Sequence, residues 1–375
     1  MSPELQLVIA ASAIPPSREG LSCIEQLTST NSLDWDVVLM LAAAHGVRPA
    51  LLRNLVPFMP AGPLDRLQSE CAALSAHNLF LAGELVRVMP ALVNAGLPVV
   101  AFKGPVLAQQ LYGDVSLREF SDLDLQVPRH RIWEAVERLR QLGYDCEPGP
   151  VGRVSLAFID SECELMMTHP AGHTIDLHWT FSASFYRPFP IDSPSAPHTL
   201  NLFGVQINTL SPVDSALFAI GHFYRHGCWS VKGVADTAAV LGRLTAGEWH
   251  ETLEAATARL CRRMALFATG VCAHFHQMPL PPEAGFAPDS VPRWLTRGIS
   301  AIEAMIACAH AGTPGSIARL RLRLSQIDSL SARARHAAHW LLAPRKSLWR
   351  ANPDRAFMLH RLTGALAVQS SRRSV

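Results

Sequence analysis

The sequence predicts an α+β protein in which a small sheet with its helices lies between two helix-rich regions. Apolar residues recur at intervals of three and four before residue 97 and again after residue 210, a spacing typical of amphipathic helices. Between these regions, apolar and polar residues alternate in short segments, as strands do. We therefore expect an N-terminal helical layer over residues 1–96, a core over residues 97–210, and a C-terminal helical region over residues 211–375.

The composition is that of a globular protein without a general surface for nucleic acid or membrane. Of the 375 residues, 49% are hydrophobic and 17% are charged, which is enough for real hydrophobic cores. The formal net charge of +2 provides no broad field for a polyanion, so nucleic acid is disfavoured as a partner but stays open. No uninterrupted apolar run reaches the roughly 18 residues of a membrane helix. The apolar run near the N-terminus has no basic residue before it, so we expect no signal peptide.

The cysteines point to a reducing compartment. All eight are scattered along the chain, without a C-x-x-C pair and without the spacing of metal ligands. Cysteines in such a pattern usually serve as small buried apolar residues. We therefore expect the protein to be cytoplasmic.

The N-terminal layer is predicted to serve mainly packing. We expect its first helix at residues 34–45, ended by Gly46, and a second helix at residues 51–56. A long helix follows over residues 63–95, where apolar residues recur at three and four positions.

The stretch from Leu97 to Val127 carries the features that point to chemistry. It predicts a strand over residues 98–102, a glycine turn at Lys103-Gly104, a helix, and a second strand over residues 122–127. A glycine turn that opens a helix presents backbone N–H groups and the positive end of the helix dipole, and these two features together bind phosphate. The sequence thus predicts a phosphate site at this turn.

Two aspartates of the second strand predict a metal site. Side chains alternate along a strand, so Asp122 and Asp124 share one face, roughly 6 to 7 Å apart at their Cα atoms. Their carboxylates repel each other unless a cation lies between them, and Mg²⁺ prefers oxygen ligands and substrate phosphates. A solvated acidic face on an edge strand would show the same pattern, but the neighbouring phosphate turn favours the metal. A face with this pair is not expected to be core.

A third aspartate completes the candidate metal site. We expect further strands at residues 154–159, 163–168 and 174–179, and a strand pair over residues 201–210. Asp176 lies on the polar face of the strand at 174–179, where it meets Asp122 and Asp124 if the two strands are neighbours. Three carboxylates would hold two metal ions about 3.5 to 4 Å apart. The alternative is that Asp176 is an ordinary aspartate on the protein surface.

These features occur together in a known family. The chain resembles the uncharacterised nucleotidyltransferase-like family of the DNA polymerase β superfamily over roughly residues 33–245. The matching residues follow one another in the family's order: Lys103-Gly104, Tyr112, Arg118, Asp122-Leu123-Asp124-Leu125, Gly143-Tyr144 and Ile175-Asp176-Leu177-His178-Trp179.

The resemblance implies a polymerase β-like nucleotidyltransferase core with a small mixed sheet, and a two-metal reaction. A nucleoside monophosphate would pass from an NTP to an acceptor, with pyrophosphate leaving and two Mg²⁺ ions as cofactors, for which Mn²⁺ is a possible substitute. Asp122 and Asp124 would bind the metal on the nucleotide, and Asp176 would complete the metal at the acceptor. The acceptor stays open between a small molecule, a peptide, a protein and tRNA.

The resemblance also assigns residues to the nucleotide. Lys103 and Gly104 would approach the triphosphate, and Arg118 would either contact phosphate or hold a carboxylate in place. The turn departs from the superfamily pattern because Pro105 follows Gly104 and removes one N–H from the phosphate cradle. His178 is expected beside the site and not as a metal ligand.

The C-terminal region is predicted to be a helical bundle. His222 and His226 are spaced for zinc but lack a third ligand, so we expect them to line the helical side of the cleft. A capping box at Thr245–Glu248 opens a helix expected over residues 249–275. Several arginines after residue 318 are expected to form a solvated basic face.

The sequence therefore predicts a Mg²⁺-dependent nucleotidyltransferase. One alternative is a catalytically silent protein that keeps the fold for binding or scaffolding. It is favoured if Asp176 faces away from Asp122 and Asp124. A second alternative is a toxin that modifies tRNA or protein.

Overall fold

The computed structural model describes residues 1–30, 32–146, 159, 162–180, 198–226, 229–259, 261–285, 292–308, 316–342, 355–356 and 358–359. Within these residues, helices predominate and the strands form one four-stranded and one two-stranded sheet, so the predicted α+β class is confirmed. The strand expected over residues 154–159 falls, apart from Ile159, outside the described residues.

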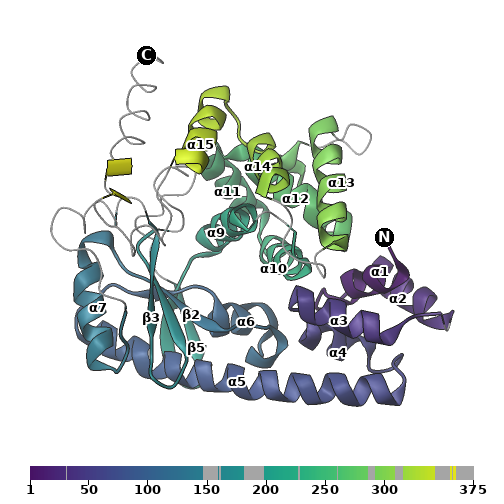
Figure 1. Ribbon diagram of the computed structural model, residues 1–375, viewed down its shortest axis with the longest axis horizontal. Helices are drawn as coiled ribbons and strands as arrows, with labels where there is room; N and C mark the ends of the chain where they lie inside the picture. Colours follow the sequence, from purple (N-terminus) through teal and green to yellow (C-terminus); the bar gives the residue numbers. More distant parts are fainter. Residues whose placement is uncertain are drawn as a thin grey trace.

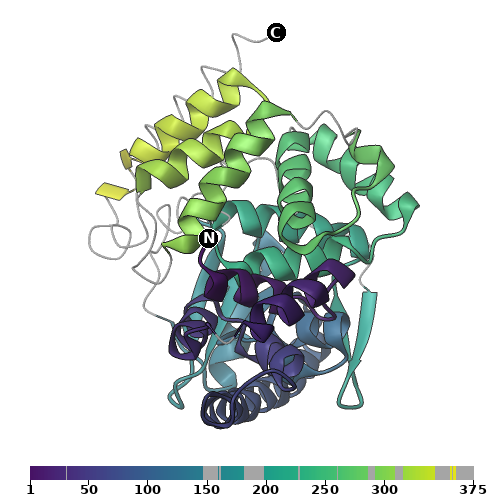
Figure 2. The ribbon, with the colours of Figure 1, turned by 90° about the vertical axis from the view of Figure 1, so that its right-hand side faces the viewer.

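The N-terminal part is helical, with one long helix beneath the rest of the molecule (Figure 1). Helix α5 continues through Pro90 and forms the base of the view, while the shorter helices gather at one end of it (Figures 1 and 2). The bounds are α1 (Pro3–Ala11), α2 (Arg18–Ser29), α3 (Trp35–His45), α4 (Arg48–Leu55) and α5 (Ala61–Asn94).

The expectation that the first helix lies at residues 34–45 is wrong, because α1 and α2 precede it. Both begin at a serine cap, Ser2 and Ser17, whose side chains accept backbone hydrogen bonds. Helix α1 is almost entirely apolar and buries Leu7 and Val8 completely. Such a helix lacks the alternation of apolar and polar faces from which amphipathic helices are recognised.

The four-stranded sheet has the order β1-β2-β4-β3. Strand β1 pairs antiparallel with β2, β2 pairs parallel with β4, and β3 pairs antiparallel with β4, so the sheet is mixed, as predicted. Its strands are β1 (Val100–Ala101), β2 (Asp122–Gln126), β3 (Glu164–Thr168) and β4 (Thr174–His178). The predicted strand pair is the second sheet, β5 (His198–Leu202) and β6 (Val205–Thr209).

One face of the larger sheet forms a hydrophobic core with two helices. Leu123 and Leu125 of β2 and Leu177 of β4 pack with apolar side chains of α5 and of α7 (Ile132–Gln141). The residues between them, at positions 122, 124, 174, 176 and 178, must point to the other side. Packing of the leucines thus determines which way the acidic face is turned.

Two short elements connect β1 to β2 and position the turn of the candidate site. They are α6 (Gly104–Tyr112) and the 3₁₀ helix η1 (Val115–Leu117). Asn78 of α5 is completely buried and donates from Nδ2 to the carbonyl oxygens of Val115, at 2.9 Å, and Arg118, at 2.8 Å. This amide therefore holds the segment that carries Arg118 against the long helix.

The C-terminal helices stand above the sheet in Figure 1. The predicted single helix over residues 249–275 is wrong, because the chain forms α11 and α12 there, with Cys261 as the cap of α12. The predicted capping box of α11 is confirmed. The bounds are α9 (Pro212–Arg225), α10 (Val231–Leu241), α11 (Ala246–Ala258), α12 (Arg262–His276), α13 (Arg293–Ala307), α14 (Ser316–Ser325) and α15 (Leu330–Leu342), with 3₁₀ helices η2 (Arg129–Arg131) and η3 (Pro282–Ala284) elsewhere in the chain.

Helices from the two ends of the described chain share one hydrophobic core. Leu7 of α1 and Val38 of α3 belong to the same buried cluster as Phe223 of α9 and Phe267 of α12. Arg323 of α14 is partly buried and donates to the carbonyl oxygen of Arg225, so it packs inward and not into solvent as expected. No described helix is long and apolar enough to cross a membrane.

We predict that Asn78→Ala lowers the free energy of unfolding by about 2 to 4 kcal/mol, because it leaves two buried carbonyl groups without their donor. Chemical denaturation measures the change. The control is His77→Ala, since His77 is the exposed neighbour on the same helix. A loss below about 1 kcal/mol for Asn78→Ala would show that the amide does not hold the segment.

Candidate functional site

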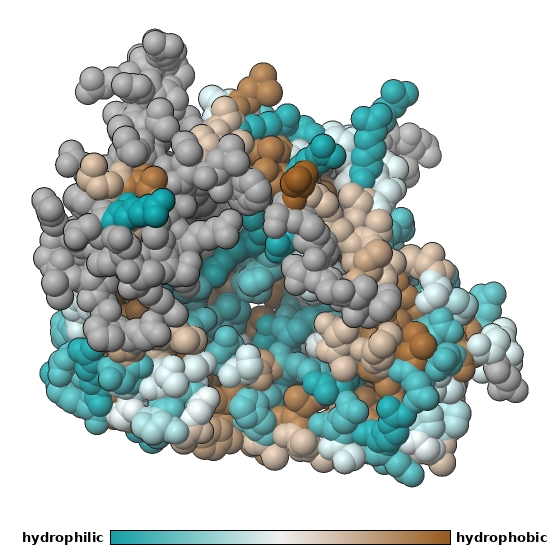
Figure 3. Space-filling view, in the orientation of Figure 1, coloured by the Kyte–Doolittle hydropathy of each residue, from teal (hydrophilic) through white to brown (hydrophobic). Residues whose placement is uncertain are grey.

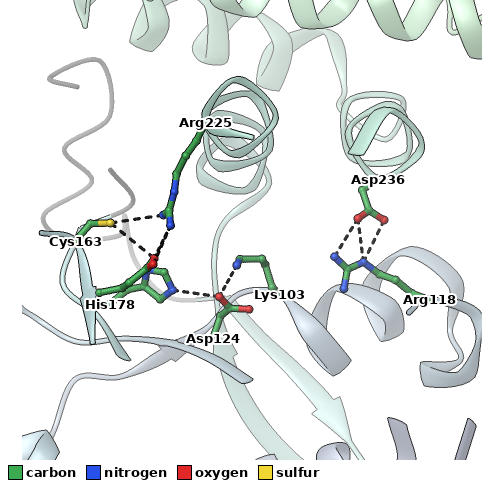
Figure 4. A network of polar contacts seen from close by, with 8 residues as sticks. Lys103, Arg118, Asp124, Cys163, His178, Arg225 and Asp236 are labelled. Atoms are coloured by element: carbon green, nitrogen blue, oxygen red, sulfur yellow. Dashed lines mark hydrogen bonds and ion pairs between the residues drawn. The ribbon is translucent and has the colours of Figure 1, made fainter. Parts of the chain in front are cut away.

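The sheet brings the three predicted carboxylates to one face. In the parallel pairing of β2 with β4, Asp124 lies directly opposite Asp176, and Asp122 lies opposite Thr174. The face was not expected to be core, but Asp124 is only 3% exposed there, while Asp122 and Asp176 are half-buried. Side chains of α9 close over it: Phe218 contacts Phe102, and Arg225 reaches down to the sheet (Figure 4).

Asp124, Asp176 and His178 form a group that could hold a metal ion. One ligand atom from each lies within 4.8 Å of the others. Asp122 is outside this group and lies half-buried at the open end of β2. The structure therefore brings Asp124 and Asp176 together as predicted, adds His178, and leaves Asp122 at the edge.

The charges of this group are unequal. Burial would raise the pKa of Asp124, but the ammonium of Lys103 and the hydrogen bond shared with His178 outweigh burial and hold the pKa well below its usual range. Burial raises the pKa of Asp122, and the negative charge of Asp124 adds to the effect. Burial and the nearby carboxylates of Glu164 and Asp124 likewise raise the pKa of Asp176. A bound cation would favour the ionised form of Asp122 and Asp176 and so lower the pKa of both.

Lys103 and Gly104 start α6 beside the acidic strand. Lys103 is the N-cap residue, and its Nζ forms an ion pair with Oδ1 of Asp124. Gly104 has a φ of +50°, and a Cβ there would lie 3.1 Å from the carbonyl oxygen of Asp122. Glycine is thus required here by its positive φ and by the close approach of α6 to β2.

The first turn of α6 offers few free donors to a phosphate. Pro105 has no N–H, and the amides of Val106 and Leu107 both donate to the carbonyl oxygen of Lys103. The charge of Lys103 is therefore the main attraction for an anion at this helix start.

Arg118 binds a carboxylate, which is one of its two expected roles. The carboxylate belongs to a residue far away in the sequence. Its guanidinium binds Asp236 of α10 through Nε at 3.1 Å and Nη2 at 2.9 Å. Lys232 of α10 pairs with the same carboxylate at 2.9 Å. The cluster of Arg118, Lys232 and Asp236 connects the segment before β2 to the C-terminal helices. Its net charge is +1.

A second cluster was not found from the sequence. Arg225 of α9 binds Glu164 of β3, with its Nη2 at 2.8 and 2.9 Å from the two carboxylate oxygens. Oε2 of Glu164 lies 3.5 Å from Nδ1 of His178. Nε2 of His178 lies 3.1 Å from Oδ1 of Asp124 (Figure 4). The direct pairing of Glu164 with His178 across the sheet places them together. The sequence shows the strands but not this register.

A cavity of about 220 Å³ adjoins the acidic face on the side of Lys103. Its walls come from α9, α10 and the β1–β2 connection, and His222 and His226 line it, as expected. Burial, with Lys103 nearby, lowers the pKa of His222 well below its usual range, so this imidazole is neutral. The charged groups of the lining are Lys103, Arg118, Lys232 and Asp236. In Figure 3 the hollow at the centre of the face is hydrophilic.

The residues present fit a divalent cation. Oδ2 of Asp124 is buried and accepts no hydrogen bond from any residue in the described part of the chain. A carboxylate oxygen in that position is a hard ligand with a full negative charge nearby. Asp176 and His178 supply further donor atoms at ligand spacing.

A small mixed sheet with carboxylates on adjacent parallel strands, next to a helix that starts at Lys103-Gly104, places the protein in the nucleotidyltransferase-like class of α+β folds. Residues 31–277 match the profile of the family described as uncharacterised nucleotidyltransferase, and the chain belongs to this family. Nucleotidyl transfer is therefore the general reaction class.

Two solved structures are similar to part of the chain. One is the antibiotic-resistance factor ANT(2'')-Ia, 14% identical over 48% of this chain and 94% of that chain, with a TM-score of 0.36. The other is an antigenic nucleotidyltransferase-like protein from Paracoccidioides brasiliensis, 14% identical over 49% of this chain and 88% of that chain, with a TM-score of 0.30. A search of curated protein sequences gave no match.

We predict that Asp236→Asn makes the free energy of unfolding less dependent on pH between about 5 and 2. Burial would raise the pKa of Asp236, but Arg118 and Lys232 outweigh burial and lower it from 3.8 to about 2. The unfolded chain therefore takes up this proton first, and the stability is present above the unfolded pKa and lost as pH falls through the folded one. The depression corresponds to about 2 kcal/mol.

Urea unfolding at several pH values measures the difference. The exposed Asp65 of α5 provides the control, Asp65→Asn, which is expected to follow the wild type. If Asp236→Asn shows the wild-type pH dependence, the ion pair does not contribute as described.

Proposed function

We propose that the protein is a Mg²⁺-dependent nucleotidyltransferase that moves a nucleoside monophosphate from an NTP to an acceptor. The observation that carries the proposal is the direct opposition of Asp124 and Asp176 in the parallel register, with an oxygen of Asp124 buried and unpartnered among the described residues. Lys103 and His178 both bind Oδ1 of this carboxylate, so Oδ2 is the oxygen that is left to bind a cation.

The chain's own residues would divide the work of binding. Asp122 and Asp124 would hold the metal that accompanies the nucleotide, and Asp176 would complete the site for the metal near the acceptor. Bound there, the two ions would neutralise charge on the phosphates and lower the pKa of the attacking hydroxyl. Lys103 would turn its ammonium from Asp124 to a phosphate oxygen when a nucleotide enters.

Positioning supplies most of the catalysis in phosphoryl transfer, and the buried location of the site supports this. Phe218 of α9 packs on Phe102 at the sheet, and Asp124 is only 3% exposed, so the central carboxylate lies where water is scarce. Electrostatic attraction is stronger in such surroundings than in bulk water.

The acceptor is left open by the shape of the site. A small molecule, a peptide, a protein side chain and tRNA all carry hydroxyl groups. The adjoining cavity of about 220 Å³ is smaller than the about 300 Å³ at which pockets for whole drug-sized ligands begin, so it suits one part of a substrate.

The catalytically silent alternative is favoured only if Asp176 faces away from the other carboxylates. The register instead sets Asp176 against Asp124, and the two ligand atoms lie within 4.8 Å. A scaffold would have no need to keep like charges together at this distance. The geometry thus supports the enzyme over the scaffold.

We predict that the double substitution Asp122→Asn, Asp124→Asn abolishes Mg²⁺-dependent binding of NTP, because it removes the charges that would hold the metal. Isothermal titration calorimetry with each of the four NTPs and Mg²⁺ measures the loss, and the tightest nucleotide identifies the preferred base. Transfer of labelled nucleotide, once an acceptor is found, is expected to fall by at least about 10²- to 10³-fold.

The control for this titration is Asp65→Asn, which removes one exposed carboxylate of α5 far along the helix from the sheet. It is expected to bind like the wild type. If no NTP binds the wild type, or if the double variant binds equally well, the proposed enzyme activity is wrong.

We predict that Lys103→Met weakens binding of Mg²⁺–NTP by about 10- to 100-fold, the loss typical of one charge-assisted contact. Binding of the metal without nucleotide is expected to be retained, since Asp124 loses a competing cation. The same calorimetry measures both, with the exposed Arg53→Met as control. Equal loss of both affinities would indicate that Lys103 only supports the fold.

A further inference from the structure

His178 lies between two carboxylates on the acidic face and is only 2% exposed. Its Nε2 is 3.1 Å from Oδ1 of Asp124, and its Nδ1 is 3.5 Å from Oε2 of Glu164. The neighbouring strands determine both contacts. Glu164 of β3 pairs directly with His178, and Asp124 of β2 pairs with Asp176, which lies two residues before His178 on the same face. The imidazole is therefore part of the acidic group and not of its surroundings.

The spacing of the donor atoms suits coordination by one ion. Adjacent ligands of an octahedral ion at about 2.1 Å lie about 3.0 Å from each other. Nε2 of His178 and Oδ1 of Asp124 are 3.1 Å apart, and one ligand atom each from Asp124, Asp176 and His178 lies within 4.8 Å of the others. Oδ1 also pairs with the ammonium of Lys103, which an ion bound there would displace. The two atoms that share a hydrogen bond here are thus already spaced as neighbouring ligands.

The other nitrogen of the ring has the surroundings of a metal-bound histidine. Histidine ligands commonly face a carboxylate with their second N–H, which holds the ring in place and makes the ligating nitrogen more basic. Glu164 lies on that side of the ring, with its Oε2 3.5 Å from Nδ1, and the guanidinium of Arg225 binds Glu164 in turn at 2.8 Å. A proton on Nδ1 facing Glu164 leaves the lone pair of Nε2 for an ion.

We propose that His178 is a metal ligand together with Asp124 and Asp176, and that this nitrogen makes the site select a divalent transition ion, Mn²⁺, over Mg²⁺. The inference rests on the proposed function for the Asp124–Asp176 pair as the metal site, and it changes one part of it, since Mn²⁺ and not Mg²⁺ is then the ion that binds more tightly. Mg²⁺ prefers oxygen and dehydrates reluctantly, whereas ions of the first transition row accept imidazole and carboxylate together. Glu164 is then a positioning residue.

Binding of Mn²⁺ and of Mg²⁺ to the full chain, without nucleotide, tests the proposal by calorimetry. The wild type is expected to bind Mn²⁺ at least about 10-fold more tightly than Mg²⁺. His178→Gln, which replaces the nitrogen by an amide group, is expected to weaken Mn²⁺ about 10- to 100-fold and to leave Mg²⁺ nearly unchanged. The matched control is His198→Gln, since His198 is an exposed histidine on β5.

Pulsed electron paramagnetic resonance gives a readout that needs no variant. Mn²⁺ bound to the wild type is expected to show modulation from a directly coordinated ¹⁴N nucleus. Because this signal comes from the unaltered protein, it decides the question even if His178→Gln does not fold.

The outcomes separate this inference from the proposed function. If both ions bind with similar affinity, Asp124→Asn abolishes both, and no ¹⁴N signal is seen, the metal site stands and the role of His178 is overturned. If neither ion binds the wild type, the metal site and the role of His178 both fail. A ¹⁴N signal with a Mn²⁺ preference that His178→Gln removes establishes the ligand.

Discussion

The buried carboxylate of Asp124 is the charge on which the arrangement of the site depends. An ionised carboxylate away from water is tolerated only with compensating partners. Lys103 reaches it from the start of α6, and His178 reaches it from the neighbouring strand. Lys103 is in reach because Gly104 lets α6 start against the backbone of β2. The glycine turn and the parallel register thus bring together the partners of this one buried charge.

The same kind of interaction attaches the C-terminal helices to the sheet. Asp236 of α10 binds Arg118 in a pair that is largely removed from water, and the partly exposed Arg225 of α9 binds the buried Glu164. Separating a buried pair leaves uncompensated charge at a cost of about 3 to 5 kcal/mol. Helices α9 and α10 therefore stay over the acidic face and form a wall of the cavity beside it. The family match over residues 31–277 spans both parts, in agreement with one site built from both.

Sequence patterns were informative where the interaction is local. The period of two in β2 and β4 placed Asp122, Asp124 and Asp176 on one face, and the capping box opened α11 where it was expected. The patterns failed for α1, which lacks an amphipathic face, and for the break between α11 and α12, where neither glycine nor proline marks the boundary. They also failed for the burial of Asp124, since α9 closes over the strand from far along the chain.

By itself, the sequence determined which residues share a face and where a helix starts, because alternation and capping depend on neighbours within about four residues. Only the tertiary structure decided the partners of the charged residues. Arg118 meets Asp236 across 118 positions, and Arg225 meets Glu164 across 61. An ion pair between distant segments carries no local signal, because it forms only after the leucines of the sheet and the apolar sides of the helices have packed and brought the charges out of water together.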